Sequence, residues 1–338
     1  MPEMRRDPLL GEWILYSPER AARPANFRSS YEKAIGSSNP FAVGNEPQTT
    51  PEILAVREPG SEPNGAGWLA RVILNKYPAV SQLPNEGEPE PPTNATASSG
   101  FFESRPVFGR HDVIVESPQE LSRFHELSVD DMRKVFGLYR ARWRQLSDDP
   151  GLAYAILFKN EGPMAGASLE HVHSQCLGLP FVPAAVERQL AAAAKYRYDC
   201  GRNFFDDFLR EELAAGTRIL AETEHFVSLC PFFSRFPYET WIVPRRAEAR
   251  FEHANADEIA ELAAEVHRVL NQMQRIRAGM PFNFMLQSAP FQIDCDESFR
   301  WYFQITPRLS QLAGLELGSG QLVNLVLPEE AARQLNAS

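Results

Sequence analysis

Apolar and polar positions along the chain predict strands that alternate with amphipathic helices. Three short apolar runs rich in β-branched residues are typical of strands: 70–75, 111–117 and 152–160. Residues 128–147 instead carry a stripe at helical spacing: Met132, Val135, Phe136, Tyr139, Trp143 and Leu146. Ser128 with Asp131 forms the start of this segment in the manner of a capping box. The pattern predicts an α+β protein.

The second half of the chain repeats this plan. Its matching segments are 239–244, 251–270, 282–290 and 300–309. Phe251 follows Phe124 by 127 residues, and Tyr302 follows His173 by 129. Elements that match at a nearly constant offset predict two copies of one unit. We therefore expect an α+β fold of two tandem units, 1–183 and 184–338, each an antiparallel sheet with packed helices.

Composition narrows the possible partners. The net charge of −10 argues against nucleic acid, whose phosphate backbone attracts basic proteins. The sequence contains no run of 18 apolar residues, so it predicts no membrane span, and its first residues show no apolar leader segment. The four cysteines are scattered and form no Cys-x-x-Cys pair, which favours free thiols in a reducing compartment. We expect a cytoplasmic protein.

The candidate chemistry lies in "AGASLEHVHSQCLGLP", residues 165–180. Alternate residues of a strand point to the same face, so a strand here would align three polar side chains: His171, His173 and Gln175. The second copy has Arg300, Tyr302 and Gln304 at these places. This asymmetry predicts one reaction centre per chain.

Three interpretations of the two histidines differ in their chemistry. A buried histidine is often structural, with one backbone partner. A neutral imidazole can also attack phosphorus when its other ring nitrogen is held by an acceptor, with Gln175, Ser168 and loop amides as donors to the phosphoryl group. A metal site needs at least one more ligand, but the other histidines are dispersed. Nucleophilic catalysis therefore ranks above metal binding.

The segment "FKNEGPMAGASLEHVHSQ" resembles the signature of the galactose-1-phosphate uridylyltransferase family, the transferase branch of the histidine-triad superfamily. The residues that carry this resemblance are Asn160, Gly166, Ser168, His171, His173 and Gln175. "RRDPLLGEWILYSPERAARP", with Arg20 and Arg23, is similar to the family's opening, and "VILNKYPAVS" to its Asn-Lys-x-Pro segment through Asn75. The C-terminal part is most similar to the subgroup of plant ADP-glucose phosphorylase-like proteins.

The resemblance implies two tandem histidine-triad-like units and a ping-pong nucleotidyl transfer. His173 would attack the α-phosphorus of a nucleotide sugar and release a sugar 1-phosphate, and a second phosphate acceptor would then take the nucleotidyl group. Gln175 would hydrogen-bond the oxygens of the covalent intermediate. Arg20 and Arg23 would bind substrate phosphate, and Asn75 and Asn160 would contact nucleotide or phosphate. A homodimer is also implied.

Zinc-bearing relatives use residues that this chain replaces. Their Cys-x-x-Cys corresponds to Asn39-Pro40-Phe41-Ala42, and the segment with their histidine after Ser-Pro corresponds to Ser117-Pro118-Gln119-Glu120, so only His171 remains of the first site. Of a second site, only Cys200 and His225 remain. We therefore predict that the protein uses no metal cofactor and that His171 orients the strand.

The first interpretation is the transfer of UMP between a nucleotide sugar, such as UDP-glucose, and a hexose 1-phosphate. Two alternatives to it stay open. One is adenylyl transfer to phosphate, as in an ADP-glucose phosphorylase. The other is a catalytically idle nucleotide-binding homologue, against which the complete set of signature residues argues.

Overall fold

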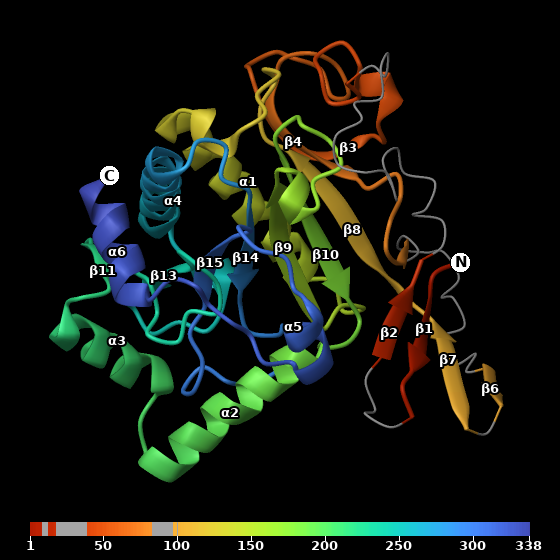
Figure 1. Cartoon of the computed structure of the whole chain (residues 1–338). Coiled ribbons are helices and arrows are strands. Elements are labelled where there is room, and N and C mark those ends of the chain that lie inside the picture. The colour runs from red at the N-terminus through yellow and green to blue at the C-terminus, as the bar shows by residue number, and fades with distance from the viewer. Residues whose placement is uncertain (9–12, 18–38, 83–96, 100) are drawn as a thin grey trace.

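The computed structural model describes residues 1–8, 13–17, 39–82, 97–99 and 101–338 (Figure 1). A sheet of 11 strands forms its centre. The strands of its first half are β3 (Glu52–Arg57), β4 (Trp68–Leu74), β5 (Ser81–Gln82), β8 (Phe108–Val115), β9 (Tyr154–Glu161) and β10 (His173–Leu179). Those of its second half are β11 (Ile219–Glu222), β12 (Phe226–Leu229), β13 (Thr240–Pro244), β14 (Phe282–Gln287) and β15 (Tyr302–Pro307).

The strand order of this sheet is symmetrical about its middle. The main path runs β11-β12-β13-β15-β14-β9-β10-β8-β4-β3, all antiparallel, while β5 pairs with β8 in parallel. At the centre, Phe158 pairs with Met285, which lies 127 residues later. Gln175 pairs with Phe158 on one side, and Gln304 pairs with Met285 on the other. The register therefore carries the repeat that the sequence shows.

Helices cover both faces of the sheet. On one face lie α1 (Val129–Ser147) and α4 (Ala256–Ile276), which pack against each other. On the other face, α2 (Ala184–Cys200) and α3 (Phe204–Ala215) cover strands of the second half. The C-terminal α6 (Pro328–Ala337) contacts α4 and β11, whereas α5 (Gly314–Ser319) buries no residue (Figure 1).

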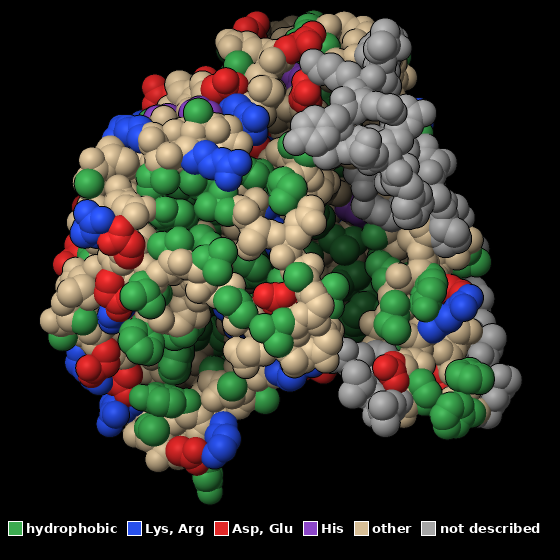
Figure 2. Space-filling model, viewed as in Figure 1, with side chains coloured by type: hydrophobic (Ala, Val, Ile, Leu, Met, Phe, Trp, Pro, Cys, Tyr) green, Lys and Arg blue, Asp and Glu red, His purple; other side chains and the backbone are tan. Residues whose placement is uncertain are grey.

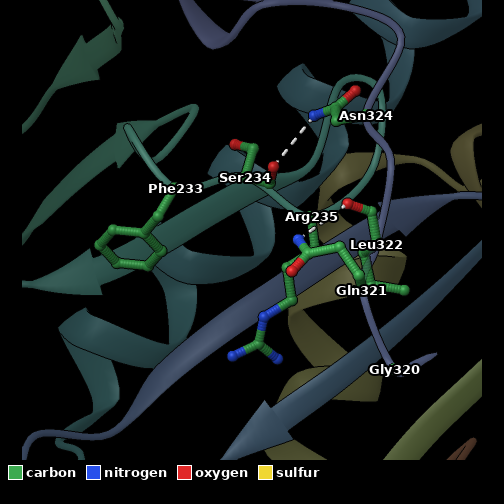
Figure 3. Close-up of a pocket in the computed structure, with 7 residues that line it drawn as sticks. All are labelled: Phe233, Ser234, Arg235, Gly320, Gln321, Leu322 and Asn324. Carbon is green, nitrogen blue, oxygen red and sulfur yellow. Dashed lines mark hydrogen bonds between the residues drawn. The ribbon is translucent and has the colours of Figure 1, made fainter. Parts of the chain in front are cut away.

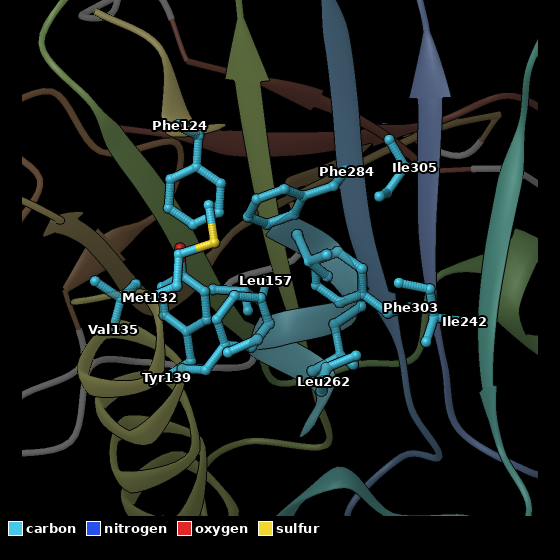
Figure 4. Packing of buried hydrophobic residues seen from close by; sticks show 14 of the residues in the cluster. Phe124, Met132, Val135, Tyr139, Leu157, Ile242, Leu262, Phe284, Phe303 and Ile305 are labelled. Atoms are coloured by element: carbon cyan, nitrogen blue, oxygen red, sulfur yellow. The ribbon is translucent and has the colours of Figure 1, made fainter. Parts of the chain in front are cut away.

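The core between the sheet and α1 and α4 draws on both halves of the chain. Phe284 and Phe303 lie with ring centroids 4.8 Å apart (Figure 4). Phe136 of α1 packs on Phe303. Leu157 and Leu262 belong to the same large buried cluster. Each such side chain contributes about 1.5–3 kcal/mol when it is fully buried. One continuous core thus joins the two units.

A separate sheet of four strands lies beside the first half. Its order is β2 (Trp13–Tyr16), β1 (Glu3–Arg6), β7 (Phe102–Pro106) and β6 (Ala97–Ser99). Met4 packs there with Val107 and Leu179, which attaches the small sheet to the end of β10. Leu179 alternates along β10 with Gln175 and His173, so the small sheet borders the strand face on which the candidate residues lie.

The α+β prediction with two tandem units is confirmed, and every strand and helix predicted from the sequence is present. One detail differs, because the two predicted sheets are joined edge to edge through β9 and β14. The boundary between residues 183 and 184 lies between β10 and α2 and stays a prediction. The four cysteines are free thiols, as expected.

Candidate active site

His173 is the first residue of β10, between β8 and β9. Its side chain points to the sheet face opposite α1, together with Gln175 on the same strand. Behind them, Ser174 and Cys176 face the core. The His173 ring is 8% exposed and packs at 5.3 Å from the ring of Phe41. The strand thus presents an imidazole at a largely enclosed position.

The tautomer of His173 follows from its backbone contact. Its Nδ1 lies 2.7 Å from the carbonyl oxygen of His171. A carbonyl oxygen only accepts hydrogen bonds, so Nδ1 carries the proton and donates. In the neutral ring the lone pair is then on Nε2, the nitrogen that points away from the backbone. This is the form of imidazole that acts as a nucleophile.

A buried polar network supports His173 from the core side. Lys159 Nζ donates to the carbonyl oxygen of His173 at 2.9 Å and pairs with Glu116 Oε2 at 2.5 Å. The hydroxyls of Tyr139 and Ser174 both donate to Glu116 Oε1. All four side chains are buried. Both charged groups of the ion pair have further hydrogen-bond partners, as buried charges require, and the pair holds the backbone at the start of β10.

Gln175 is held by two side chains from neighbouring segments. His111 Nε2 lies 3.1 Å and Asn75 Nδ2 lies 3.5 Å from Gln175 Oε1. Asn75 also closes a turn, because its Oδ1 accepts from the backbone N–H of Tyr77 at 2.9 Å. Asn75 is therefore both the turn residue and the neighbour of Gln175. With its oxygen engaged, the amide group of Gln175 has its donor end left for the site.

The sequence predicts that His171 shares a strand face with His173 and Gln175, and this prediction is wrong. The strand begins only at His173. The N–H of Val172 donates to the carbonyl of Leu121, outside the sheet, although the Val172 carbonyl still accepts from the N–H of Glu116. His171 Nε2 donates to the carbonyl oxygen of Ser117 at 2.8 Å. Its Nδ1 then accepts from Asn39 Nδ2 at 2.9 Å. Burial lowers the pKa of His171, which keeps this ring neutral.

These contacts bear on whether His171 can bind a metal ion. Both of its ring nitrogens are engaged by an amide and a carbonyl, neither of which is a preferred zinc ligand. Asn39 is the residue at the place of the relatives' first cysteine. In the described ranges, no group of three His, Cys, Asp or Glu side chains lies close enough to hold a metal ion. The residues around His171 therefore do not fit a zinc ion.

Asn160 and Gly166 border the site on the side of the second half. Asn160, on β9, accepts from Asn283 Nδ2 at 2.7 Å, and the same nitrogen donates to the carbonyl of Ala165 at 2.9 Å. Gly166 has φ +84°, a conformation that glycine adopts without strain. It ends the short 3₁₀ turn Pro163–Ala165, after which Ser168 leads toward His171. Asn283 thus ties this loop to the sheet.

The remaining predicted residues have a different status. Arg20 and Arg23 lie outside the described residues.

Four residues of the site escaped the sequence interpretation: His111, Glu116, Lys159 and Asn283. Charged residues on the apolar face of predicted strands were the available signal for Glu116 and Lys159. His111 lies two residues before Val113 on a predicted strand, but only the pairing register brings it to Gln175.

The surface near β10 is hollowed. Figure 2 shows the hollow between the body of the molecule and the small sheet, with hydrophobic side chains along it. A separate pocket of about 330 Å³ lies in the second half, lined by residues that include Ser234, Arg235, Gln321 and Asn324 (Figure 3). Asn324 Nδ2 donates to the Ser234 carbonyl there at 3.0 Å. Of the predicted site residues that the structure describes, none lines that pocket.

The chain matches one known family over most of its length. The N-terminal domain of galactose-1-phosphate uridyl transferase matches residues 60–183, and its C-terminal domain matches residues 189–336. ADP-glucose phosphorylase of Arabidopsis thaliana is 31% identical, over 98% of this chain and 92% of that protein. Galactose-1-phosphate uridylyltransferase of Thermotoga maritima is 27% identical, over 99% of this chain and 98% of that protein.

Solved structures agree with these sequence matches. An ADP-glucose phosphorylase from Arabidopsis thaliana with bound ADP-glucose has a TM-score of 0.76 and 29% identity, covering 100% of this chain and 99% of that chain. A uridylyltransferase has a TM-score of 0.78 and 25% identity, covering 99% of this chain and 97% of that chain.

The fold and the matches define a nucleotidyl-transferring enzyme built from two related units. The chain belongs to the galactose-1-phosphate uridyl transferase family. The family resemblance inferred from the residues is confirmed, as is the expectation of an enzyme. No described helix is long and apolar enough to cross a membrane.

Proposed function

We propose that the protein transfers a nucleoside monophosphate from a nucleotide sugar to a phosphate acceptor through a covalent bond to His173. The observation that carries the proposal is the bond from His173 Nδ1 to the His171 carbonyl, which places the lone pair of the neutral ring on Nε2. Nε2 would attack the α-phosphorus, the N–P bond would form, and the bond to the sugar 1-phosphate oxygen would break. An oxygen of the acceptor phosphate would then displace the imidazole.

The surroundings of His173 suit both steps. When Nε2 bonds to phosphorus the ring becomes cationic, and the His171 carbonyl faces the Nδ1 proton of that ring. The donor end of Gln175, two residues away on the same strand face, suits the anionic oxygens of the nucleotidyl group. Asn160, whose Oδ1 accepts from Asn283, has its Nδ2 group as a further donor at the border of the site. Arg20 and Arg23 remain our candidates for binding substrate phosphate.

The donor has two candidates. UDP-glucose, with a hexose 1-phosphate as acceptor, is the donor expected from the family. ADP-glucose, with phosphate as acceptor, is favoured by the 31% identity to an ADP-glucose phosphorylase over nearly the whole chain. Both donors place the same diphosphate next to His173, so the geometry of the transfer is shared.

Intact-protein mass spectrometry without acceptor tests the mechanism. After brief incubation with UDP-glucose or ADP-glucose, we expect the mass of one nucleoside monophosphate on the wild-type chain. The adduct should be lost in acid, as a phosphorus–nitrogen bond is. The donor that labels faster identifies the transferred nucleotide.

Two variants serve as controls for this labelling. His173→Ala should abolish the adduct while the protein stays folded. His253→Ala removes an exposed imidazole on another segment and should label as the wild type does. Labelling that persists in His173→Ala would refute the nucleophile, and no labelling of the wild type by either donor would refute the covalent route.

We further propose that the protein needs no zinc and forms a homodimer in the cytoplasm. The hydrogen bonds of His171 to Asn39 and Ser117 support the first statement. Exposed apolar side chains near the C-terminus, Leu317, Leu325 and Leu327, support an interface between copies. Elemental analysis that finds about one zinc per chain would contradict the first proposal. A monomer in analytical ultracentrifugation would contradict the second.

A further inference from the structure

The two glutamines at corresponding places of the two halves bind the corresponding residues His111 and Glu239 through opposite ends of their amides. Gln175 Oε1 faces His111 Nε2 at 3.1 Å, so the carbonyl end of this side chain is engaged. Gln304 instead donates from Nε2 to Glu239 Oε1 at 2.8 Å, so its amino end is engaged. Gln304 Oε1 accepts from Gln287 at 3.3 Å. The register places Gln175 opposite Val113 and Gln304 opposite Trp241, which makes His111 and Glu239 corresponding residues.

The direction of the His111 bond follows from its other ring nitrogen. The backbone N–H of Ala79 donates to His111 Nδ1 at 2.9 Å. A backbone N–H only donates, so Nδ1 carries the lone pair and the proton of the neutral ring is on Nε2. His111 therefore donates to Gln175 Oε1. Asn75 Nδ2 lies 3.2 Å from His111 Nε2, but a protonated Nε2 cannot accept, so Asn75 donates to Gln175 Oε1 and not to the ring. The ring is 1% exposed, and β8 holds its backbone in the sheet.

The end of Gln175 that faces the site decides what it can bind. A carboxamide has a donor end and an acceptor end of nearly the same shape. The oxygens of a phosphoryl group accept hydrogen bonds, so an amino end attracts them and a carbonyl end repels them. With an acceptor at position 111, as Glu239 is in the second half, the amide would turn its carbonyl toward the site.

We propose that His111 is a positioning residue, which donates to Gln175 Oε1 and so turns the Gln175 amino group toward the nucleotidyl group on His173. The inference rests on the proposed function of the site. Asn75, whose Nδ2 lies 3.5 Å from the same oxygen, assists in this orientation.

Two substitutions separate the two bonds of His111. In His111→Asn the shorter side chain reaches the place of Nδ1 and keeps an acceptor for Ala79, but it has no donor at the place of Nε2. In His111→Gln the side chain amide reaches the place of Nε2 and keeps that donor. We expect labelling by the faster donor at saturation to slow about 10- to 100-fold in His111→Asn, and by less than about 3-fold in His111→Gln. The half-saturating donor concentration should change less than about 3-fold in both.

A double-mutant cycle tests whether His111 acts through Gln175. In the Gln175→Ala background, His111→Asn should slow labelling by less than about 2-fold, because the group that His111 orients is gone. A purely structural role would give the same factor in both backgrounds. Equal factors, or wild-type labelling in His111→Asn, would overturn the inference.

A spectroscopic measurement on the wild-type chain complements the variants. In protein with ¹⁵N-labelled histidine, long-range ¹H–¹⁵N correlation should show His111 as the Nε2-protonated tautomer. A ring protonated on Nδ1 would overturn the inference whatever the variants do. If wild-type protein is not labelled by either donor, the proposed function fails and this inference fails with it. Labelled wild-type protein with an unaffected His111→Asn refutes the positioning role alone.

Discussion

The two halves of the large sheet share strand order and register but differ in the chemistry behind their corresponding strands. In the first half, Tyr139, Lys159 and Ser174 surround the buried carboxylate of Glu116. The residues 127 or 129 positions later are apolar and fully buried: Val266, Leu286 and Phe303. The second half therefore reaches the same fold without the polar network.

This difference shows that the network is not needed to form the fold. A buried ion pair is often no more stabilising than well-packed apolar side chains in its place. What the network adds in the first half is the bond from Lys159 to the carbonyl of His173. The face in front differs as well, because α2 and α3 cover Tyr302, which stacks on Trp241 with centroids 4.1 Å apart. On this face of the sheet, the first half carries the candidate active site, and the second half carries a packed apolar cluster.

The largest expected effect comes from giving the first half the residue of the second. Lys159→Leu leaves Glu116 buried with hydroxyl partners but without its countercharge. We expect the free energy of unfolding to fall by about 3–5 kcal/mol, measured by urea denaturation. The double variant Glu116→Gln/Lys159→Leu, which buries no charge, should recover part of this loss. A Lys159→Leu variant as stable as the wild type would contradict the importance of the pair.

The next effect concerns the two glutamines. Gln175→Ala removes a donor to the nucleotidyl group, and we expect the rate of adduct formation to fall about 10²- to 10³-fold. Gln304→Ala is the matched control in the second half, where the side chain bonds Glu239 away from His173. Its labelling rate should stay within about 2-fold of the wild type. Equal losses in both variants would show that the site extends over both halves.

A smaller effect distinguishes the caps of two corresponding backbone groups. The N–H of Phe124 donates to the carboxyl of Glu161 at 2.8 Å, and that of Phe251 donates to the hydroxyl of Ser288 at 3.0 Å. Burial raises the pKa of Glu161 to about 7, from the ordinary value of 4.5. Between these values the unfolded chain loses the proton that the folded chain keeps. This group therefore lowers the free energy of unfolding as pH rises through that window.

Replacement of that carboxyl should make stability less dependent on pH. Between pH 4.5 and 7.5, the free energy of unfolding should fall by about 2–3 kcal/mol more in the wild type than in Glu161→Gln. Ser288→Ala should instead lower stability by the same amount at each pH, because no proton is involved. Urea denaturation at several pH values measures both. Parallel pH profiles of wild type and Glu161→Gln would refute the raised pKa.

The comparison also shows how much the sequence alone predicts. Strands, helices and the repeat were predictable because apolar periodicity and a constant offset are local features of the chain. The shared strand face of His173 and Gln175 was predictable because the two residues alternate within one motif. His111 and Asn283 were missed because their role depends on strand pairing, which brings together residues that are 64 and 123 positions apart from their partners. His171 was assigned to the strand, although its neighbour Val172 bonds to Leu121 and delays the start of β10.

The smallest expected effect lies at the two corresponding helix starts. Ser128 accepts from the N–H of Asp131 at the start of α1, and Asn255 accepts from the N–H of Glu258 at the start of α4. In α4 the Glu258 side chain also accepts from the Asn255 N–H, which completes a capping box. We expect Ser128→Ala to cost about 1 kcal/mol of unfolding free energy and Asn255→Ala about 1–2 kcal/mol, measured by urea denaturation. A larger loss for Ser128→Ala would mean that the helix of the first half depends more on its cap, and would reverse this part of the comparison.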